Sequence, residues 1–190
     1  MSLRGFHSRG YLPHLDNPKK IQAVTFRLAD TLPKSKIEEW KSDLERFAED
    51  EKSQKLRVLV SKFEDSGAGE CLLRHTECAR AVRDAMLFNE GNSHHLLAWC
   101  IMPNHVHAVL RVDERTSLGK LIKSWKQFSA NRINELLERS GQVWAVDYFD
   151  RYIRDEEHLA RAIDYVHRNP VKAGLCQSPE IWRWSSAGSN

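Results

Sequence analysis

Two histidines stand two residues apart in the segment Met102-Pro-Asn-His-Val-His107. In an extended strand, residues i and i+2 point to the same face, so His105 and His107 would present two imidazoles side by side. Imidazole is the commonest metal ligand among protein side chains. An exposed strand can also carry such a pair without any function. A functional site would need a further ligand, a nucleophile and a surface for the substrate.

Tyr165 and Asn169 are candidates for the missing nucleophile and ligand. The chain has four tyrosines, and most tyrosines serve only in packing. Tyr165 differs because Asn169 lies at i+4, on the same helix face one turn later. Its amide oxygen could complete a His-His-Asn metal site beside the phenol. The alternative is that Asn169 caps the end of the helix before Pro170.

Apolar periodicity predicts the elements that must position these residues. Strands are expected at about 20–29, at 94–102, at 105–112 and within 143–153. Helices are expected at 35–50 (with Ser35 and Glu38 as a capping box), at about 75–89, at 117–139 and from 154 to Pro170. When one additional helix before 75 is set aside, the order is β-α-β-β-α-β followed by a terminal helix. This order predicts an α+β, ferredoxin-like antiparallel sheet with an additional C-terminal helix.

The segment 105–112 alternates between two kinds of side chain. The face that carries His105 and His107 also carries Val109 and Arg111. The opposite face is wholly apolar and is expected to meet the core: Val106, Ala108, Leu110 and Val112.

Length and composition indicate one globular domain, 1–190. We expect an N-terminal tail at 1–18, an insertion at 51–70 and a C-terminal tail at 175–190. Hydrophobic residues make up 41% and charged residues 29% of the chain, which excludes wholesale disorder. No apolar run approaches the roughly 20 residues of a membrane span, and the first residues lack the apolar core of a signal peptide. The four cysteines form no C-x-x-C pattern, which is typical of a reduced, cytoplasmic protein.

The net charge of +3 does not by itself indicate a nucleic-acid binder. Lysines recur every three residues along the helix expected at 117–139, however, and gather on one side of it. This side is either a plain solvated face or a surface that neutralises DNA phosphates. The residues expected to bind DNA are Lys120, Lys123, Lys126, Ser129 and Arg132.

Four segments together resemble the single-tyrosine HUH transposases, and most closely the REP-associated tyrosine transposases. They are Met102-Pro-Asn-His-Val-His107, Lys126-Gln-Phe-Ser129, Asp164-Tyr-Val-His-Arg-Asn-Pro-Val-Lys-Ala-Gly174 and Trp184-Ser-Ser-Ala187. Gly10-Tyr-Leu-Pro-His-Leu15 and Thr25-Phe-Arg-Leu-Ala-Asp-Thr-Leu-Pro33 are similar to the N-terminal signature of that family. The resemblance covers nearly the whole chain in the right order, but covers 50–70 poorly.

The resemblance implies a site and an activity. His105 and His107 would hold a divalent ion, Mg²⁺ or Mn²⁺, with help from Asn169, and Tyr165 would be the nucleophile. The activity would be metal-dependent cleavage and rejoining of single-stranded DNA next to a hairpin, through a covalent 5′-phosphotyrosine. No other side chain near Tyr165 in the pattern is an obvious base, so we expect loss of the phenol proton to depend on the metal. Such a protein would be nucleoid-associated in the cytoplasm, as a monomer or a homodimer.

Four other classes of protein could carry parts of this pattern. A histidine-triad hydrolase would carry a third histidine where Val109 stands. A metallo-β-lactamase-like nuclease would carry Asp and His directly after the pair, where Ala108 and Val109 stand. A purely structural α+β domain would leave the combination of motifs unexplained. A catalytically silent, domesticated DNA-hairpin-binding protein stays open, because intact site residues do not by themselves prove activity.

Overall fold

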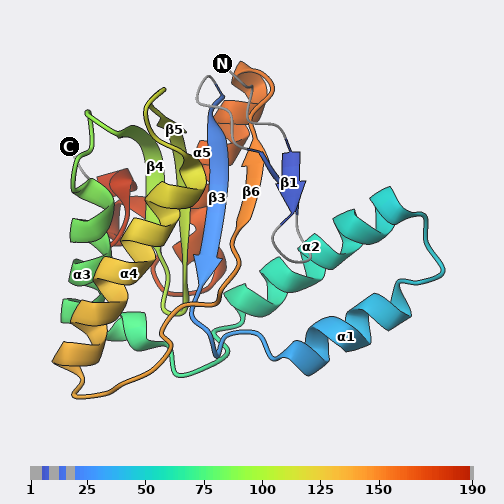
Figure 1. The fold of residues 1–190 in the computed structure, drawn as a ribbon, viewed down its shortest axis with the longest axis horizontal. Helices are drawn as coiled ribbons and strands as arrows, with labels where there is room; N and C mark the ends of the chain where they lie inside the picture. Colours follow the sequence, from blue (N-terminus) through green and yellow to red (C-terminus); the bar gives the residue numbers. More distant parts are fainter. Residues whose placement is uncertain (1–5, 9–12, 16–19, 189–190) are drawn as a thin grey trace.

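The computed structural model describes residues 6–8, 13–15 and 20–188 (Figure 1). An antiparallel sheet in the strand order β4-β5-β3-β6 forms its centre. The four strands are β3 (Gln22–Arg27), β4 (His94–Ile101), β5 (His105–Val112) and β6 (Phe149–Tyr152). Two short strands, β1 (Phe6–Ser8) and β2 (Pro13–Leu15), pair with each other. The architecture confirms the predicted α+β fold.

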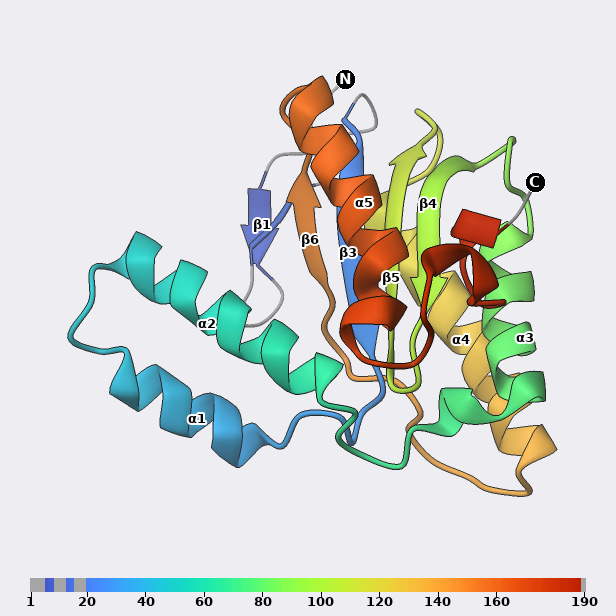
Figure 2. The same cartoon turned by 180° about the vertical axis from the view of Figure 1, so that it is seen from behind.

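Helices cover both faces of the central sheet. On one face α3 (Thr76–Leu87) packs beside α4 (Leu118–Leu136), and on the other lies α5 (Glu156–Lys172) (Figures 1 and 2). The apolar side of β5 meets the α3–α4 face, as its alternation predicts: Val106, Ala108, Leu110 and Val112 are all buried in the main core. Val109, on the histidine side, belongs instead to a smaller cluster under α5.

Two further helices form an antiparallel hairpin that projects from the edge of the sheet. They are α1 (Lys34–Asp43) and α2 (Glu49–Asp65) (Figure 1). The predicted capping box is wrong, because α1 begins one residue earlier, with Pro33 at its N-cap and no side chain bonded there. Ser35 therefore already has helical backbone and cannot take the extended conformation that a capping residue needs.

The C-terminal end of α2 is attached to the core by buried polar contacts. Arg27 pairs with Glu64 at 3.4 Å, and both side chains are buried. The Asn104 amide donates to the carbonyl of Glu64 at 3.0 Å and to that of Ala68 at 2.9 Å. Because Asn104 lies in the turn between β4 and β5, these bonds fix the end of α2 beside the start of the histidine strand.

The predicted end of the terminal helix at Pro170 is wrong, because α5 continues to Lys172. Proline lacks the N–H that would bond to the Val166 carbonyl, yet the next turn still closes, with the Ala173 N–H donating to the Asn169 carbonyl at 3.0 Å. Asn169 therefore has helical backbone inside α5. Its side chain does not cap the helix.

None of the helices in the described parts of the chain is long and apolar enough to cross a membrane.

Candidate active site

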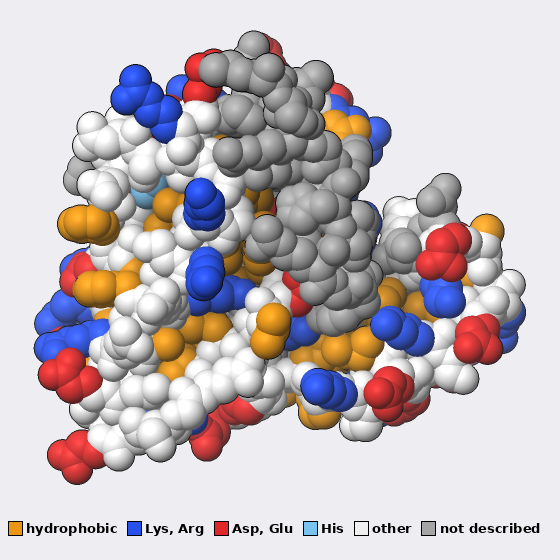
Figure 3. Space-filling model, viewed as in Figure 1, with side chains coloured by type: hydrophobic (Ala, Val, Ile, Leu, Met, Phe, Trp, Pro, Cys, Tyr) orange, Lys and Arg blue, Asp and Glu red, His pale blue; other side chains and the backbone are white. Residues whose placement is uncertain are grey.

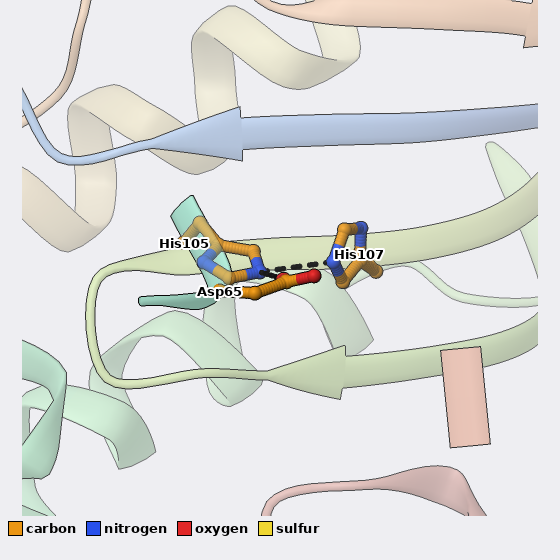
Figure 4. A group of neighbouring side chains, drawn as sticks. All are labelled: Asp65, His105 and His107. Atoms are coloured by element: carbon orange, nitrogen blue, oxygen red, sulfur yellow. Dashed lines mark hydrogen bonds and ion pairs between the residues drawn. The ribbon is translucent and has the colours of Figure 1, made fainter. Parts of the chain in front are cut away.

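The two histidines of β5 converge on one point. Both imidazoles are buried, and their Nε2 atoms lie 2.9 Å apart (Figure 4). A side-chain partner holds the other nitrogen of each ring. The Oδ1 atom of Asn104 lies 2.7 Å from Nδ1 of His105, and Oγ1 of Thr25 lies 2.8 Å from Nδ1 of His107. The two rings are thus oriented before any ligand arrives.

The hydrogen-bond partners assign protons to these rings. An amide oxygen only accepts, so Nδ1 of His105 carries the proton and its Nε2 offers a lone pair. The short Nε2–Nε2 contact then requires the His107 Nε2–H to donate to His105, with the Thr25 hydroxyl donating to Nδ1. A hydroxyl can either donate or accept, so Thr25 also supports the other tautomer, which frees Nε2 of His107 for a metal.

Burial keeps both histidines neutral. It lowers the pKa of His107 to about 4. Burial lowers the pKa of His105 well below its usual value, and the neighbouring His107 and Arg27 act in the same direction. Neutral imidazole is the form that binds a metal.

An oxygen atom from α2 lies beside the histidine pair. Asp65, the last residue of α2, places Oδ1 3.6 Å from Nε2 of His105 (Figure 4). Asp65, His105 and His107 together could hold a metal ion, since their ligand atoms all lie within 4.8 Å of one another. Asn169 is buried on α5, and its two amide atoms have no hydrogen bond of normal geometry with any described residue.

Tyr165 lies beside this group. Its ring packs edge-on against His107, with ring centroids 5.4 Å apart. Its hydroxyl lies 3.0 Å from that of Ser61 on α2, and the Lys172 ammonium lies 4.8 Å from the centre of its ring. Burial raises the pKa of Tyr165, while hydrogen bonding by Ser61 and the nearby Asn169 amide lowers it. The Asn169 contact is too irregular to count as a full hydrogen bond.

The donor set fits a divalent cation. When Thr25 accepts from Nδ1 of His107, both neutral imidazoles present Nε2 lone pairs to a common point, and a carboxylate oxygen without a hydrogen bond to any described residue lies next to them. Nitrogen and oxygen donors of this kind suit several divalent ions, and carboxylate or amide oxygens favour Mg²⁺ and Mn²⁺. The sequence prediction and the structure agree on the two histidines, and the structure adds Asp65 as a neighbour.

The five residues expected to bind DNA lie elsewhere. All belong to α4, which covers the sheet face opposite α5 and Tyr165. Figure 3 views the α4 side, where lysine and arginine side chains stand over the helix. Lys120, Lys123 and Arg132 are exposed there, and Arg132 pairs with Glu135 at 2.7 Å. A DNA contact at these residues would be separate from the tyrosine site.

Lys126 and Ser129 have structural bonds inside the protein. The Lys126 ammonium donates to the carbonyls of Ala145, Val146 and Asp147 at 3.0–3.3 Å. The Ser129 hydroxyl is fully buried, donates to the Trp125 carbonyl at 2.6 Å and accepts from the Trp144 indole at 3.0 Å. Both side chains therefore attach the segment before β6 to α4.

We expect Lys126→Met to destabilise the protein by about 2–4 kcal/mol, because three backbone carbonyls lose a charged donor. Urea unfolding measures this cost, with the exposed Lys123→Met as a matched control that should change stability by at most about 0.5 kcal/mol. A Lys126→Met variant that is as stable as the parent but binds DNA more weakly would show that Lys126 contacts DNA.

Asn104→Ala is expected to cost about 2–4 kcal/mol, because it removes two bonds to the end of α2 and the acceptor for His105. Amide hydrogen exchange should then show that, relative to the parent protein, the variant loses more protection in α2 than in β5. Asn92→Ala, in an exposed turn, is the control. Unchanged protection throughout α2 would contradict the proposed attachment.

Sequence reasoning missed three residues of this site. Asp65 and Ser61 lie in a charged helix that carries no motif. Thr25 could be assigned to the site only from the strand register, which pairs it with His107. Of the N-terminal signature, residues 10–12 lie outside the described residues.

Comparison with known proteins agrees with this geometry. Residues 76–169 match the family described as "Transposase IS200 like". A Haemophilus influenzae protein named as a candidate REP-associated tyrosine transposase is 30% identical over 103 residues, covering 47% of this chain and 57% of that protein. A REP-associated tyrosine transposase of Escherichia coli is 21% identical over 89 residues, covering 47% of this chain and 52% of that protein. The matches thus span little more than half the length of these relatives.

The fold has a counterpart among solved structures. A REP-associated tyrosine transposase bound to a REP hairpin superposes with a TM-score of 0.58 and 15% identity, covering all of this chain and 84% of that one. At this identity the likeness concerns the fold. The family match includes both histidines of β5 and also Tyr165 and Asn169 of α5, and the ring of Tyr165 packs against His107. The chain is therefore similar to the family described as "Transposase IS200 like" over its residues 76–169.

Proposed function

We propose that this protein cleaves and rejoins single-stranded DNA at sites next to DNA hairpins, through a covalent 5′-phosphotyrosine on Tyr165. One observation carries the proposal: the Tyr165 ring lies against His107, whose Nε2 lies 2.9 Å from that of His105. This contact supports a site in which Tyr165 and the candidate metal ligands of the same chain act together. The hairpin is proposed from the relative that is bound to one, and the site of action would be chromosomal DNA in the cytoplasm.

His105 and His107 would hold Mg²⁺ or Mn²⁺, with oxygen donors from Asp65 or Asn169. When bound, the ion would polarise the scissile phosphate and offset its charge. Three side chains of the protein hold the nucleophile. The Ser61 hydroxyl bonds to that of Tyr165, His107 supports one edge of the ring, and Lys172 lies over the ring.

The proposed reaction exchanges one phosphate ester for another. The Tyr165 oxygen forms a bond to phosphorus and loses its proton, while the bond from phosphorus to the 3′ oxygen breaks and that oxygen gains a proton. A 3′-hydroxyl from another strand can then attack the phosphotyrosine and release the phenol. Because one phosphodiester is made for each one broken, no external energy source is needed.

The direct test uses a labelled single-stranded oligonucleotide that contains a hairpin with unpaired flanks. After incubation with Mn²⁺ or Mg²⁺, a denaturing gel should show label retained on the protein. Hairpin binding without any adduct, across related hairpins and both ions, would instead favour a catalytically silent DNA-hairpin-binding protein.

A further inference from the structure

Among the described residues, the helix on one face of the sheet packs mainly on two of its four strands. On that side α5 packs mainly on β4 and β5 (Figure 2). The neighbouring strands β3 and β6 instead form the floor of a cleft of about 650 Å³, with α2 on one side and α5 on the other. Tyr165, Ser61 and His107 are part of this lining. The cleft therefore opens directly onto the proposed nucleophile.

Strand register defines the floor of the cleft. Thr25 of β3 pairs with His107 of β5 on one side and with Phe149 of β6 on the other. These three side chains form one row across the sheet. Since neighbouring strands lie about 4.8 Å apart, the row extends roughly 10 Å from the metal ligand to the aromatic ring. In the next row, Arg151 lies beside Ala23.

The wall and floor of the cleft carry positive charge without matching acids. Arg57 of α2, Arg151 of β6 and the nearby Arg154 form no ion pair with any described residue. Burial and the charge of Arg151 lower the pKa of Arg57, and Asp150 only partly opposes them. Two guanidinium groups thus lie close enough to repel each other, an arrangement that an anion would relieve.

The acidic lining residues already have partners. Glu64 pairs with Arg27, and the Asp155 carboxylate accepts the His158 backbone N–H at 2.7 Å. The remaining lining is largely apolar, and it includes the ring of Phe149 with the guanidinium of Arg57 5.2 Å from its centroid. Proteins that bind a single nucleic-acid strand combine cationic side chains, which bind its phosphates, with aromatic rings, on which its bases stack. The cleft offers both kinds of side chain.

We propose that the unpaired DNA strand next to the scissile phosphate lies in this cleft, with phosphates at Arg57 and Arg151 and a base at Phe149. The inference rests on the proposed function for the position of the scissile phosphate. It assigns the single strand to the α2–α5 cleft and not to the lysines of α4. It also gives the projecting helix hairpin a role, because α2 supplies one wall.

Salt-dependent binding tests this assignment. The probes are a fluorescein-labelled DNA hairpin with an unpaired flank on each side and the same hairpin with blunt ends. For the flanked probe, Arg57→Ala/Arg151→Ala should reduce the slope of log K against log salt by about 1.4, since each single-strand phosphate contact contributes about 0.7. The blunt probe should show no change. Arg80→Ala/Arg83→Ala, which removes one exposed and one half-exposed charge from α3, should leave both slopes unchanged.

The outcomes separate this inference from the proposed function. An unchanged slope on the flanked probe, in a variant whose thermal unfolding shows that it is folded, overturns the cleft assignment even if the parent protein forms the covalent adduct. An equal reduction of the slope for the blunt probe also overturns the cleft assignment, because the arginines would then contact duplex DNA. A reduced slope specific to the flanked probe supports the cleft, and it does so even if no adduct forms. Arg57→Lys/Arg151→Lys should restore most of the slope.

Discussion

Tyr165→Phe is expected to abolish the covalent protein–DNA adduct while leaving hairpin binding within about twofold of the parent. The substitution removes only the phenol oxygen, and no other described side chain occupies the same position beside His107. The phenyl ring can keep its packing against His107 and its place under Lys172. Adduct is measured on a denaturing gel and binding by fluorescence anisotropy with the same labelled hairpin.

The loss should be chemical, because the cost to folding is small. Tyr165→Phe removes one hydrogen bond to Ser61, which is worth about 1 kcal/mol. Tyr152→Phe, on β6, is the matched control and should form adduct like the parent. If Tyr152→Phe loses the adduct and Tyr165→Phe keeps it, the nucleophile has been assigned to the wrong residue.

The second large effect concerns the metal. Mn²⁺ or Mg²⁺ should raise the thermal midpoint of the parent protein, since a ligand at 100 times its Kd adds about 2.7 kcal/mol to stability. His107→Ala should abolish this shift, because one of two converging nitrogen donors is lost and Nε2 of His105 is left alone. Differential scanning fluorimetry across a metal titration measures the shift without requiring DNA or activity.

The control for this experiment is another buried histidine. His94 lies on β4, and its Nε2 bonds to the Met86 carbonyl at 2.8 Å, so His94→Gln should lower the midpoint but keep the metal-dependent shift. A shift that survives His107→Ala would rule out the histidine pair as the metal site. Asp65→Asn and Asn169→Ala are compared in the same titration. The substitution that weakens metal binding more identifies the oxygen ligand.

Local pattern was enough to predict the histidine strand and most helices. The period of two in 105–112 assigned both faces of β5 correctly, because alternate side chains of a strand must point to opposite sides. Ser117 caps α4 at the start of the helix expected at 117–139, accepting the Lys120 backbone N–H at 3.3 Å. The i+4 spacing likewise put Tyr165 and Asn169 on one face of α5. Each of these features depends on residues only a few positions apart.

Long-range packing decided the rest of the site. Asp65 and Ser61 reach it only because buried bonds from Asn104 and Arg27 hold the end of α2 there, across about 40 residues of sequence. The three-residue spacing of the lysines predicted that they lie on one side of α4. It could not reveal that the carbonyls of Ala145, Val146 and Asp147 would accept hydrogen bonds from Lys126, which is half-buried. The two histidines, Tyr165 and Asn169 could thus be proposed from the sequence alone. Long-range contacts decided which oxygen lies next to the histidines and which cationic side chains stay exposed. Such contacts cannot be predicted from the local periodicity of the sequence.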